Sequence, residues 1–597
     1  MRYNWKIGGE AGFGIVTSGL VFSKIVARSG YHLYDYAEYP SLIRGGHNTY
    51  DVAFSDDIIT SSIEQIDMLV CLNEATYTLH KNRLSKNSVV IYDSDEFSID
   101  NTNSGVAVSF KKIRKEQDIQ FQMVNTIAVG ASLALLGGDI SIFEDILRSQ
   151  FSRKGQEVID FNIKLAKIGY EACINNPFKK NILSKKTNEV KLVLAGNEAF
   201  SLGAVVADCR YFAAYPMTPA SSVLTSLATW QKKSKMVVRH SEDEIAVINS
   251  ALGASFAGVR SAVATSGGGF ALMVEALSYS GIAEIPIVVF LSMRPGPATG
   301  MPTWTETADL LFAVHSGHGE FPKIVLAPGD SVEMLELTLK AFDLADIYQT
   351  PVLVLSDKCL SESHQDFLKS KIDEIVKNHK PNRGKIVKST NSKPYLRYKI
   401  ENDGISEMLI PGQQDIYYQA NSYEHFEDSH TSEESDVRVA QVDKRHKKLE
   451  SYLSKEFKPP VWYGEKDADT IFVSWGGMKG AIVEAQKLLK DNHGLNTGFI
   501  HFTHIHPLDE NKLIKYFDVT ENSSKRYILV ENNSQGQFGQ LLRMNTGINI
   551  KEKLLKYDGR PILPEEIVQK ILNLGNINQD KNPSSEEKIM TKLEQKM

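Results

Sequence analysis

The part of the chain that decides the fold runs from residue 215 to residue 320 and opens with Tyr215-Pro216-Met217-Thr218-Pro219-Ala220-Ser221. The mostly apolar residues 209–214 before it predict a short strand, and Ser221 and Ser222 suit the N-cap of a helix over residues 223–230. Neither proline donates an N–H, and each favours an extended residue before it, so the strand ends here. A hydroxyl between a strand end and a helix N-terminus suits an anionic ligand. A purely structural corner is the alternative.

Glu244 is the acidic residue that falls on the predicted core-facing side of the next helix. At 100° per residue, one apolar stripe of that helix holds Ile245, Ile248, Ala251, Leu252 and Ser255. Glu244 falls within this stripe, whereas Glu242 and Asp243 point away from it. A carboxylate on a core-facing stripe is costly unless it is paired or protonated, so Glu244 is a candidate functional acid. The alternative is an ordinary acid of the first helical turn.

Arg294 is the third candidate, because it follows a predicted apolar strand over residues 285–291. It opens the irregular segment Arg294-Pro295-Gly296-Pro297-Ala298-Thr299-Gly300, which is too rich in glycine and proline to be core. The crevices beyond strand ends are where α/β sheets bind ligands, and a guanidinium there can hold a carboxylate with two hydrogen bonds. A solvated loop arginine is the alternative.

The composition is that of a soluble protein with several domains. Of 597 residues, 42% are hydrophobic and 23% are charged. The 67 basic and 73 acidic residues give a net charge of -6, which implies no general attraction to nucleic acid. No stretch approaches the ~18 uninterrupted apolar residues of a membrane span. We therefore expect a cytoplasmic protein with no nucleic-acid or membrane partner.

The four cysteines stand far apart, at Cys71, Cys173, Cys209 and Cys359. No Cys-x-x-Cys pair is present, so we expect neither a local zinc site nor an iron–sulfur cluster on this chain. The residues Glu424-His425 and His430 match no common metal motif, and no metal site is expected. If the protein is a redox enzyme, its electron carriers lie on another chain.

Near the N-terminus, a predicted strand runs into Gly8-Gly9-Glu10-Ala11-Gly12-Phe13-Gly14, and a helix is predicted over residues 15–29. The backbone N–H groups of such a turn, at Gly9, Gly12 and Gly14, can approach a phosphate. The glycine spacing is not Gly-x-Gly-x-x-Gly, so dinucleotide binding is the weaker hypothesis, although Asp35 stands where a ribose-binding acid would. A purely structural turn is the alternative.

The pattern of strands and helices predicts an α/β protein with three α/β domains. Strands that alternate with helices after residue 190 predict a parallel sheet with right-handed crossovers. The predicted parts are a first α/β domain (1–175), a polar linker (176–190), a second α/β domain (191–365), an irregular extension (366–460), a third α/β domain (461–575) and a polar tail (576–597).

Several motifs resemble the alpha subunit of the thiamine diphosphate-dependent 2-oxoacid:ferredoxin oxidoreductases. They are the runs 215–221, Glu242-Asp243-Glu244-Ile245-Ala246, Thr265-Ser266-Gly267-Gly268-Gly269-Phe270-Ala271-Leu272-Met273, 294–300 and His318-Gly319-Glu320-Phe321-Pro322. The resemblance covers about residues 5–575. The family more often has Ser-Gly-Pro-Gly where Gly268 stands, and Gln-Arg-Gly-Gly-Pro where Met293 and Pro295 stand. Neither departure removes a reacting group.

The resemblance implies a role for each candidate residue. The first domain is similar to the family's gamma subunit, the second to its pyrimidine-binding fold, and the third to its transketolase C-terminal-like domain. In the family, an acid at the position of Glu244 acts on the pyrimidine of thiamine diphosphate. By the same resemblance, the 2-oxoacid is contacted by Thr218, Tyr215 and Arg294, the coenzyme also by Pro216, Ser266, Gly267 and Gly269, and coenzyme A by the first-domain loops at Gly9, Gly12, Gly14 and Arg44.

The resemblance also implies a partner. No Gly-Asp-Gly motif occurs in the chain, so Mg²⁺ and a 4Fe-4S cluster are expected on a beta subunit only, with thiamine diphosphate shared between the two chains. Coenzyme A is the expected co-substrate, ferredoxin the electron acceptor and (alpha-beta)2 the assembly. The fused gamma–alpha layout favours 2-oxoglutarate; pyruvate or another 2-oxoacid is one alternative, and a non-catalytic scaffold subunit is the other.

Overall fold

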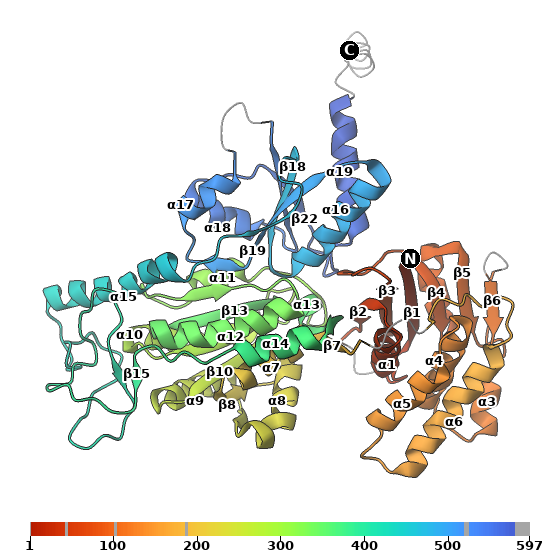
Figure 1. The fold of residues 1–597 in the computed structure, drawn as a ribbon, viewed down its shortest axis with the longest axis horizontal. Helices are drawn as coiled ribbons and strands as arrows, with labels where there is room; N and C mark the ends of the chain where they lie inside the picture. The colour runs from red at the N-terminus through yellow and green to blue at the C-terminus, as the bar shows by residue number, and fades with distance from the viewer. Residues whose placement is uncertain (1, 42–45, 101–103, 185–188, 519–523, 580–597) are drawn as a thin grey trace, which may run out of the picture.

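The computed structural model describes residues 2–41, 46–100, 104–184, 189–518 and 524–579. Figure 1 shows three sheet-centred parts, with the first at the N-terminal end, the second in the middle of the chain and the third at the C-terminal end. Helices pack against each of these sheets. The predicted α/β class is confirmed. Among the described residues, no helix combines the length and the apolar character that crossing a bilayer requires.

The first sheet has the strand order β6-β5-β4-β1-β3-β2-β14-β7. Its strands are β1 (Arg2–Glu10), β2 (His32–Glu38), β3 (His47–Ser55), β4 (Ile66–Cys71), β5 (Leu84–Tyr92), β6 (Ser104–Ala107), β7 (Lys191–Ala195) and β14 (His364–Leu368). The helices of this part include α1 (Ile15–Arg28), α4 (Val124–Leu135), α5 (Ile140–Gln150) and α6 (Gln156–Cys173). The glycine turn joins β1 to α1, as predicted.

β7 differs from the prediction, because it was expected to open the second sheet. It pairs instead with β14, which pairs with β2, so both strands extend the first sheet. Asp366 on β14 strengthens this edge by accepting a hydrogen bond from Leu33 N at 2.7 Å and by pairing with Lys191 Nζ at 3.0 Å. A local pattern predicts the strand but not its distant partner.

The second sheet has the order β20-β12-β13-β11-β10-β8-β9, and all of its strands except β20 run parallel. They are β8 (Cys209–Ala214), β9 (Val237–His240), β10 (Arg260–Thr265), β11 (Ile287–Met293), β12 (Ile324–Leu326), β13 (Pro351–Asp357) and β20 (His504–His506). The helices are α7 (Gly196–Val206), α8 (Ser221–Ser234), α9 (Glu244–Phe256), α10 (Gly267–Ala283), α11 (Leu310–His315), α12 (Ser331–Tyr348) and α13 (Lys358–Glu362). The predicted parallel sheet is confirmed.

The third sheet has the order β17-β19-β18-β21-β22. Its elements are β17 (Val461–Gly464), β18 (Thr470–Trp475), α16 (Lys479–His493), β19 (Thr497–Phe502), α17 (Glu510–Leu513), β21 (Arg526–Glu531), α18 (Gln537–Thr546), β22 (Glu552–Leu555) and α19 (Pro564–Gln579). α19 extends past the predicted domain end at residue 575, and residues 580–597 of the predicted tail lie outside the described residues.

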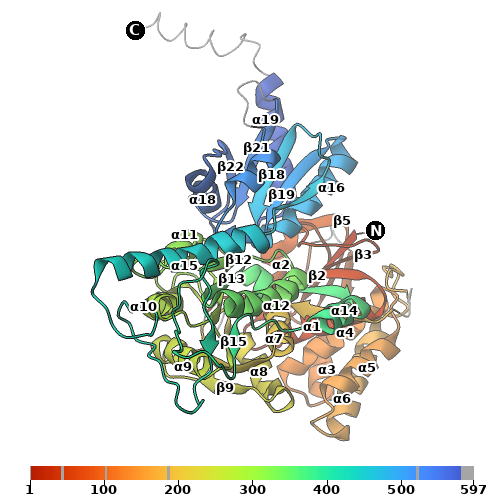
Figure 2. The same cartoon turned by 60° about the vertical axis from the view of Figure 1, so that its left-hand side comes forward.

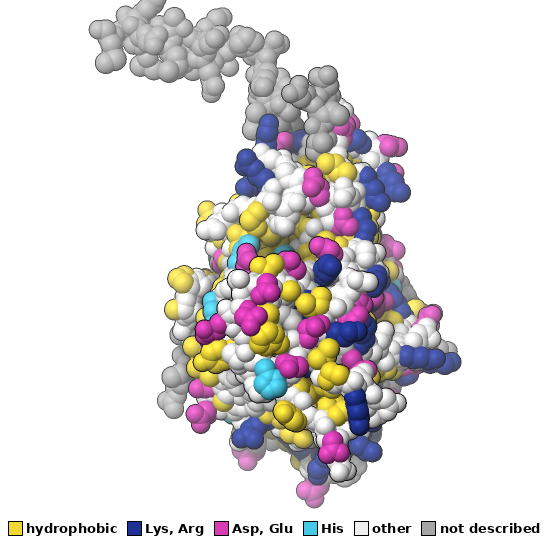
Figure 3. Space-filling view, turned by 90° about the vertical axis from the view of Figure 1, so that its left-hand side faces the viewer, with side chains coloured by type: hydrophobic (Ala, Val, Ile, Leu, Met, Phe, Trp, Pro, Cys, Tyr) yellow, Lys and Arg dark blue, Asp and Glu magenta, His cyan; other side chains and the backbone are white. Residues whose placement is uncertain are grey.

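The extension holds α14 (Lys369–Asn378), a short parallel pair of β15 (Ile386–Val387) and β16 (Met408–Leu409), and the long helix α15 (Ser435–Lys455). Figure 2 shows α15 passing between the second and third parts. There Tyr452 Oη lies 2.5 Å from His504 Nδ1. On the side shown in Figure 3, hydrophobic side chains lie among charged side chains of both signs. The extension is thus an ordered part that joins two domains.

Two local predictions about helices are wrong. The N-cap of α8 is Ala220, and Ser222 Oγ accepts a hydrogen bond from the distant Asn197 Nδ2 at 2.7 Å instead of capping the helix. On α9, Ile245 is 51% exposed and Val247 is buried, because the buried side of this helix faces β8 and β10.

Glu424 and His425 of the extension contact other side chains of the same extension. Glu424 accepts hydrogen bonds from Arg438 and Arg445, and the His425 ring lies 3.7 Å from the ring of Tyr398. Within the part of the chain that the structure describes, no three His, Cys, Asp or Glu side chains are grouped as metal ligands.

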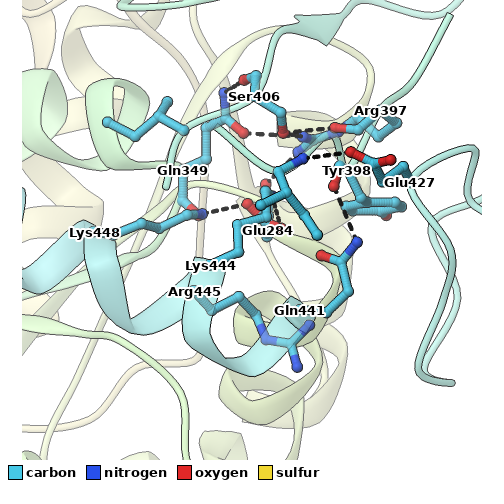
Figure 4. Close-up of polar contacts among 12 residues, drawn as sticks. Glu284, Gln349, Arg397, Tyr398, Ser406, Glu427, Gln441, Lys444, Arg445 and Lys448 are labelled. Carbon is cyan, nitrogen blue, oxygen red and sulfur yellow. Dashed lines mark hydrogen bonds and ion pairs between the residues drawn. The ribbon is translucent and has the colours of Figure 1, made fainter. Parts of the chain in front are cut away.

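Glu284 anchors the extension to the second sheet through buried charges (Figure 4). Its carboxylate, which is fully buried, pairs with Lys444 and with Lys448 Nζ, the latter at 2.5 Å. Arg397 Nη2 donates to Glu284 O at 2.8 Å. Burial alone would raise the pKa of Glu284, but Lys444, Lys448 and Arg397 outweigh it and hold this pKa below its usual range. Burial lowers the pKa of Lys448 to about 7, and the negative charge of Glu284 keeps this pKa from falling further.

Glu284→Gln should destabilise the protein strongly, because it leaves two buried ammonium groups without a counter-ion. A loss of about 3–5 kcal/mol is typical of breaking such a pair. The thermal unfolding midpoint of the purified chain, with limited proteolysis of the extension, measures the effect. Asp373→Asn is the control, because it breaks the exposed pair with Lys369 and should change the midpoint little. Equal midpoints for the two variants would contradict the anchoring role.

Candidate functional site

Three of the candidate segments follow neighbouring parallel strands. β8, β10 and β11 lie side by side, and Tyr215, Ser266 and Arg294 each come directly after the end of one of them. Since the carboxyl ends of parallel strands meet at one edge of a sheet, the three segments converge there. This edge is where α/β sheets ordinarily bind ligands, in a crevice beyond the strand ends, and the name crevice is used for it.

The turn at residue 218 and the segment at residue 294 are joined directly. Arg294 Nη1 donates a hydrogen bond to Thr218 O at 2.7 Å. Burial lowers the pKa of Arg294, and the charge of Asp309 opposes this shift. Tyr215 is 38% exposed, with its ring centroid 6.2 Å from that of His240, and Pro216 is also exposed. Arg294 and Thr218 thus lie together at this edge of the sheet, whereas Tyr215 and Pro216 are exposed.

Glu244 is buried, as its position on the predicted stripe indicated, and is only 3% exposed. It is the first residue of α9, whose N-cap is Asp243, with Asp243 Oδ1 accepting from Ala246 N at 2.7 Å. Among the described residues, the buried Glu244 Oε1 has no hydrogen-bond partner. A Cβ added to Gly269 would lie less than 3.0 Å from this oxygen and from Thr265 Oγ1. The carboxylate is therefore packed against the first turn of α10.

A second buried oxygen without a partner lies next to this turn. Ser266 is fully buried, and its Oγ has no hydrogen-bond partner within the described part of the chain. Buried polar groups are ordinarily hydrogen-bonded, because an unsatisfied one costs about 1–3 kcal/mol. Two such oxygens near one helix start, at Glu244 and Ser266, fit a polar ligand that supplies the missing hydrogen bonds.

Two further acids, Glu306 and Asp309, lie in the segment before α11 and were not among the predicted residues. The segment before α11 alternates, with Thr303, Thr305 and Thr307 buried and the residues between them half-buried. A Cβ on Gly267 would lie less than 3.0 Å from the Asp309 carboxylate. The period of two in burial along residues 303–307 puts Trp304 and Glu306 on one face of the segment, and Arg560 Cζ lies 3.2 Å from the centroid of the Trp304 ring.

The glycine turn of the first domain has the expected backbone. Gly12 and Gly14 have φ values of 92° and 74°, and Asn125 Nδ2 donates to Phe13 O and Gly14 O at 3.0 and 3.2 Å. A cavity of about 330 Å³ lies beside the turn. Gly9 lies near the end of β1, and Arg44 lies outside the described residues.

Asp35 does not bind a ribose in this arrangement. Its carboxylate is buried and accepts hydrogen bonds from Ser23 Oγ and Tyr50 Oη at 2.7 and 2.6 Å. It also accepts from His364 N on β14 at 2.6 Å. Asp35 therefore holds the edge of the first sheet, and the dinucleotide hypothesis loses its ribose-binding acid.

Comparisons with known proteins match two stretches of the chain to family models. Residues 202–444 match the model described as "Pyruvate flavodoxin/ferredoxin oxidoreductase, thiamine diP-bdg", and residues 4–172 match "Pyruvate ferredoxin/flavodoxin oxidoreductase". The 2-oxoacid:ferredoxin oxidoreductase subunit alpha of Saccharolobus solfataricus is 33% identical, over 96% of this chain and 97% of the relative. The 2-oxoglutarate synthase subunit KorA of Archaeoglobus fulgidus is 30% identical, over 63% of this chain and 97% of the relative.

A solved structure gives the same answer. The 2-oxoglutarate:ferredoxin oxidoreductase from Magnetococcus marinus, with 2-oxoglutarate, coenzyme A and succinyl-CoA bound, has a TM-score of 0.86 and 30% identity, and the match covers 96% of this chain and 99% of that chain. The chain belongs to the 2-oxoacid:ferredoxin oxidoreductase family, as an alpha subunit with a thiamine diphosphate-binding domain. The predicted family is confirmed.

Gly269→Ala should damage the site, because the added methyl group has no room beside the Glu244 carboxylate. Overpacking of this kind typically costs about 1–3 kcal/mol. Gly268→Ala is the matched control on the same helical turn, since the nearest atom to its Cβ would be Ala298 O at 3.9 Å. The thermal unfolding midpoint should fall for Gly269→Ala only. Equal midpoints would show that Glu244 does not pack against this turn.

Proposed function

We propose that this chain is the alpha subunit of an enzyme that oxidatively decarboxylates a 2-oxoacid, with coenzyme A as acyl acceptor and ferredoxin as one-electron acceptor. The observation that carries the proposal is the buried, unpartnered carboxylate oxygen of Glu244 in the crevice that Arg294 and Thr218 share. 2-Oxoglutarate is the favoured substrate, supported by the fused layout and by the printed names of two of the proteins compared above. Pyruvate or another 2-oxoacid is the alternative.

The residues at the crevice fit thiamine diphosphate. Bound there, this coenzyme supplies an electron sink for the electron pair that decarboxylation leaves on the substrate. Glu244 would hold a proton at its carboxyl group against the pyrimidine ring, and Ser266 Oγ would supply a further polar contact. Gly267 and Gly269 have no side chains, so the carboxylates of Asp309 and Glu244 can lie against the first turn of α10. Pro216 would contact the pyrimidine ring.

Arg294 is the group that we propose for the substrate carboxylate. Nη1 is engaged with Thr218 O, but Nε and Nη2 have no hydrogen-bond partner among the described residues. A guanidinium that is held on one side can present its other N–H groups to a carboxylate. The Thr218 hydroxyl and Tyr215 would complete the substrate contacts. A scaffold subunit would not need this arrangement, so the enzyme hypothesis is favoured.

The proposed partner is a beta subunit that carries the Gly-Asp-Gly motif, Mg²⁺ and the 4Fe-4S cluster. This chain has four cysteines, none of them paired in a Cys-x-x-Cys motif, and three of them are buried. Three large apolar side chains on α9, α10 and α11 are exposed: Ile245 is 51% exposed, Leu272 50% and Phe312 37%. Such a surface suits a partner that covers the site. An (alpha-beta)2 assembly is the proposed form.

Coenzyme A is proposed to bind the gamma-like first domain. The support is the glycine turn with positive φ at Gly12 and Gly14, and the cavity beside it. Backbone N–H groups of such turns suit phosphate. Arg44, which lies outside the described residues, is part of the same proposal.

Co-expression with a beta subunit tests the proposed function. The purified pair is screened with 2-oxoacids for coenzyme A-dependent reduction of a one-electron dye. The chain alone should be colourless and inactive, because it has neither clustered thiolates nor the metal motif. An iron–sulfur absorption band or turnover by the chain alone would contradict the two-subunit proposal.

Glu244→Gln should abolish most activity without unfolding the assembled enzyme. The amide keeps the size of the side chain but cannot hold a titratable proton, so exchange of the coenzyme C2 proton should fall by roughly a hundredfold or more. Hydrogen exchange followed by NMR measures this rate. Glu242→Gln, which changes an exposed acid just before the same helix, is the control. Equal exchange rates would favour the scaffold alternative.

Arg294→Lys should raise the KM for the 2-oxoacid by about tenfold or more. A point ammonium does not reproduce the planar grip of a guanidinium, although it keeps the charge. Steady-state kinetics of the assembled enzyme, with coenzyme binding measured separately, give the two quantities. An unchanged KM would return Arg294 to a structural role at Thr218.

A further inference from the structure

Asn197, the second residue of α7, binds the turn that carries Thr218. Its side-chain nitrogen Nδ2 donates to Pro219 O at 2.8 Å and to Ser222 Oγ at 2.7 Å. Asn197 is 1% exposed, and these two partners are 22 and 25 residues further along the chain. Both hydrogens of the amide group are therefore donated to one distant segment.

The hydrogen bond to Pro219 explains why an asparagine occupies this buried position. A carbonyl oxygen only accepts hydrogen bonds, so the nitrogen of the Asn197 amide, and not its oxygen, must face Pro219 O. Asn197 Oδ1 is buried, and among the described residues it has no hydrogen-bond partner. A buried polar atom without a partner costs free energy, so packing alone would favour an apolar side chain of this shape. The amide is therefore needed here as a donor.

The turn is bound at two consecutive carbonyl oxygens. Arg294 Nη1 donates to Thr218 O at 2.7 Å, and Asn197 Nδ2 donates to the next carbonyl, Pro219 O. These oxygens belong to the peptide groups on either side of Pro219, and the proline ring itself restricts φ between them. The two donors therefore constrain the backbone from residue 218 to residue 220, and with it the direction in which the Thr218 side chain leaves the turn.

The elements that carry the two donors are both packed against α13. A Cβ on Gly196, the first residue of α7, would lie less than 3.0 Å from Leu360 O of α13. At the end of β11, Ser292 Oγ lies 2.6 Å from Ser361 Oγ of α13, and all three serines or glycines named here are buried. The start of α7 and the end of β11 are thus fixed to one helix, which sets the distance between the two donors.

We propose that Asn197 is a positioning residue of the 2-oxoacid site, which binds the Pro219 carbonyl and thereby orients the Thr218 hydroxyl toward the substrate. The inference rests on the proposed function, in which Thr218 contacts the 2-oxoacid. Asn197 touches neither the substrate nor the coenzyme and acts through the turn. A contact that the bound substrate already makes affects KM more than kcat, so the loss of this donor should appear in KM.

Asn197→Ala and Ser222→Ala, made separately in the assembled enzyme, test the proposal. Asn197→Ala removes both hydrogen bonds, and KM for the 2-oxoacid should rise by about tenfold, as for one lost hydrogen bond, with kcat changed less. Ser222→Ala leaves the bond to Pro219 O and should keep KM close to that of the wild type. Asn545→Ala is the control, because this exposed amide donates at 2.8 Å to Leu541 O within its own helix. The thermal unfolding midpoint shows whether each variant is folded, and Asn197→Leu, which keeps a branched side chain, is the second variant.

Hydrogen exchange of the purified chain gives a second readout that needs no activity. The turn is closed by Ala220 N, which donates to Met217 O at 2.9 Å, and by Val223 N, which donates to Ala220 O at 3.1 Å. Without the Asn197 amide the turn should open more often, so residues 217–223 should exchange about tenfold faster, as measured by mass spectrometry. Ser222→Ala should leave this exchange close to the wild-type rate.

The outcomes separate the inference from the proposed function. If Arg294→Lys raises KM but Asn197→Ala changes neither KM nor the exchange of the turn, the inference is wrong and the proposed function stands. A loss of kcat with KM unchanged, or equal rises of KM in Asn197→Ala and Ser222→Ala, would also overturn the inference. If Asn197→Ala raises KM and Arg294→Lys does not, the proposed role of Arg294 fails and the inference stands. An assembled wild-type enzyme that turns over no 2-oxoacid would overturn both.

Discussion

The parallel register of β8, β10 and β11 is the constraint on which the rest of the site depends. Three segments that are up to 79 residues apart, from Tyr215 to Arg294, reach one place because parallel strands end at one edge. The hydrogen bond from Arg294 to Thr218 O then fixes two of them to each other. The crevice is thus a product of backbone topology, and its side chains are placed by where their strands end.

The domains are joined by shared sheets and by buried polar contacts. β7 and β14 complete the first sheet, and β20 adds an antiparallel strand to the second. The polar run after β21 has a clear structural use, because Asn532 and Gln537 hold the segment that carries Glu306 and Asp309. The third domain therefore fixes the segment before α11, and its Arg560 Cζ lies 3.2 Å from the centroid of the Trp304 ring. Glu284 joins the extension to the second part of the chain, since its carboxylate pairs with Lys444 and Lys448 of α15.

Local patterns predicted much of this arrangement. The predicted strand over residues 209–214 is β8, and the predicted strand over 285–291 is β11 shifted by two residues. The helical stripe predicted the burial of Glu244 and the exposure of Glu242, although Ile245 on the same stripe is exposed. Neither Ser221 nor Ser222 caps α8, because the helix begins one residue earlier, with Ala220 as its N-cap, and Ser222 Oγ accepts a hydrogen bond from the distant Asn197 Nδ2. Patterns of period and composition are local, so they fail where a distant side chain competes.

Neighbouring residues alone predicted the α/β class and the candidate positions at Thr218, Glu244 and Arg294, because strand ends, apolar stripes and Gly-Pro segments are local patterns. The family was predicted from the resemblance of five short motifs. The position of β7 in the first sheet and the packing of Asp309 on Gly267 could be known only from the folded chain. These facts depend on pairing between residues far apart in the chain. Such pairing is selected by the free energy of the whole fold, which no short stretch of sequence contains.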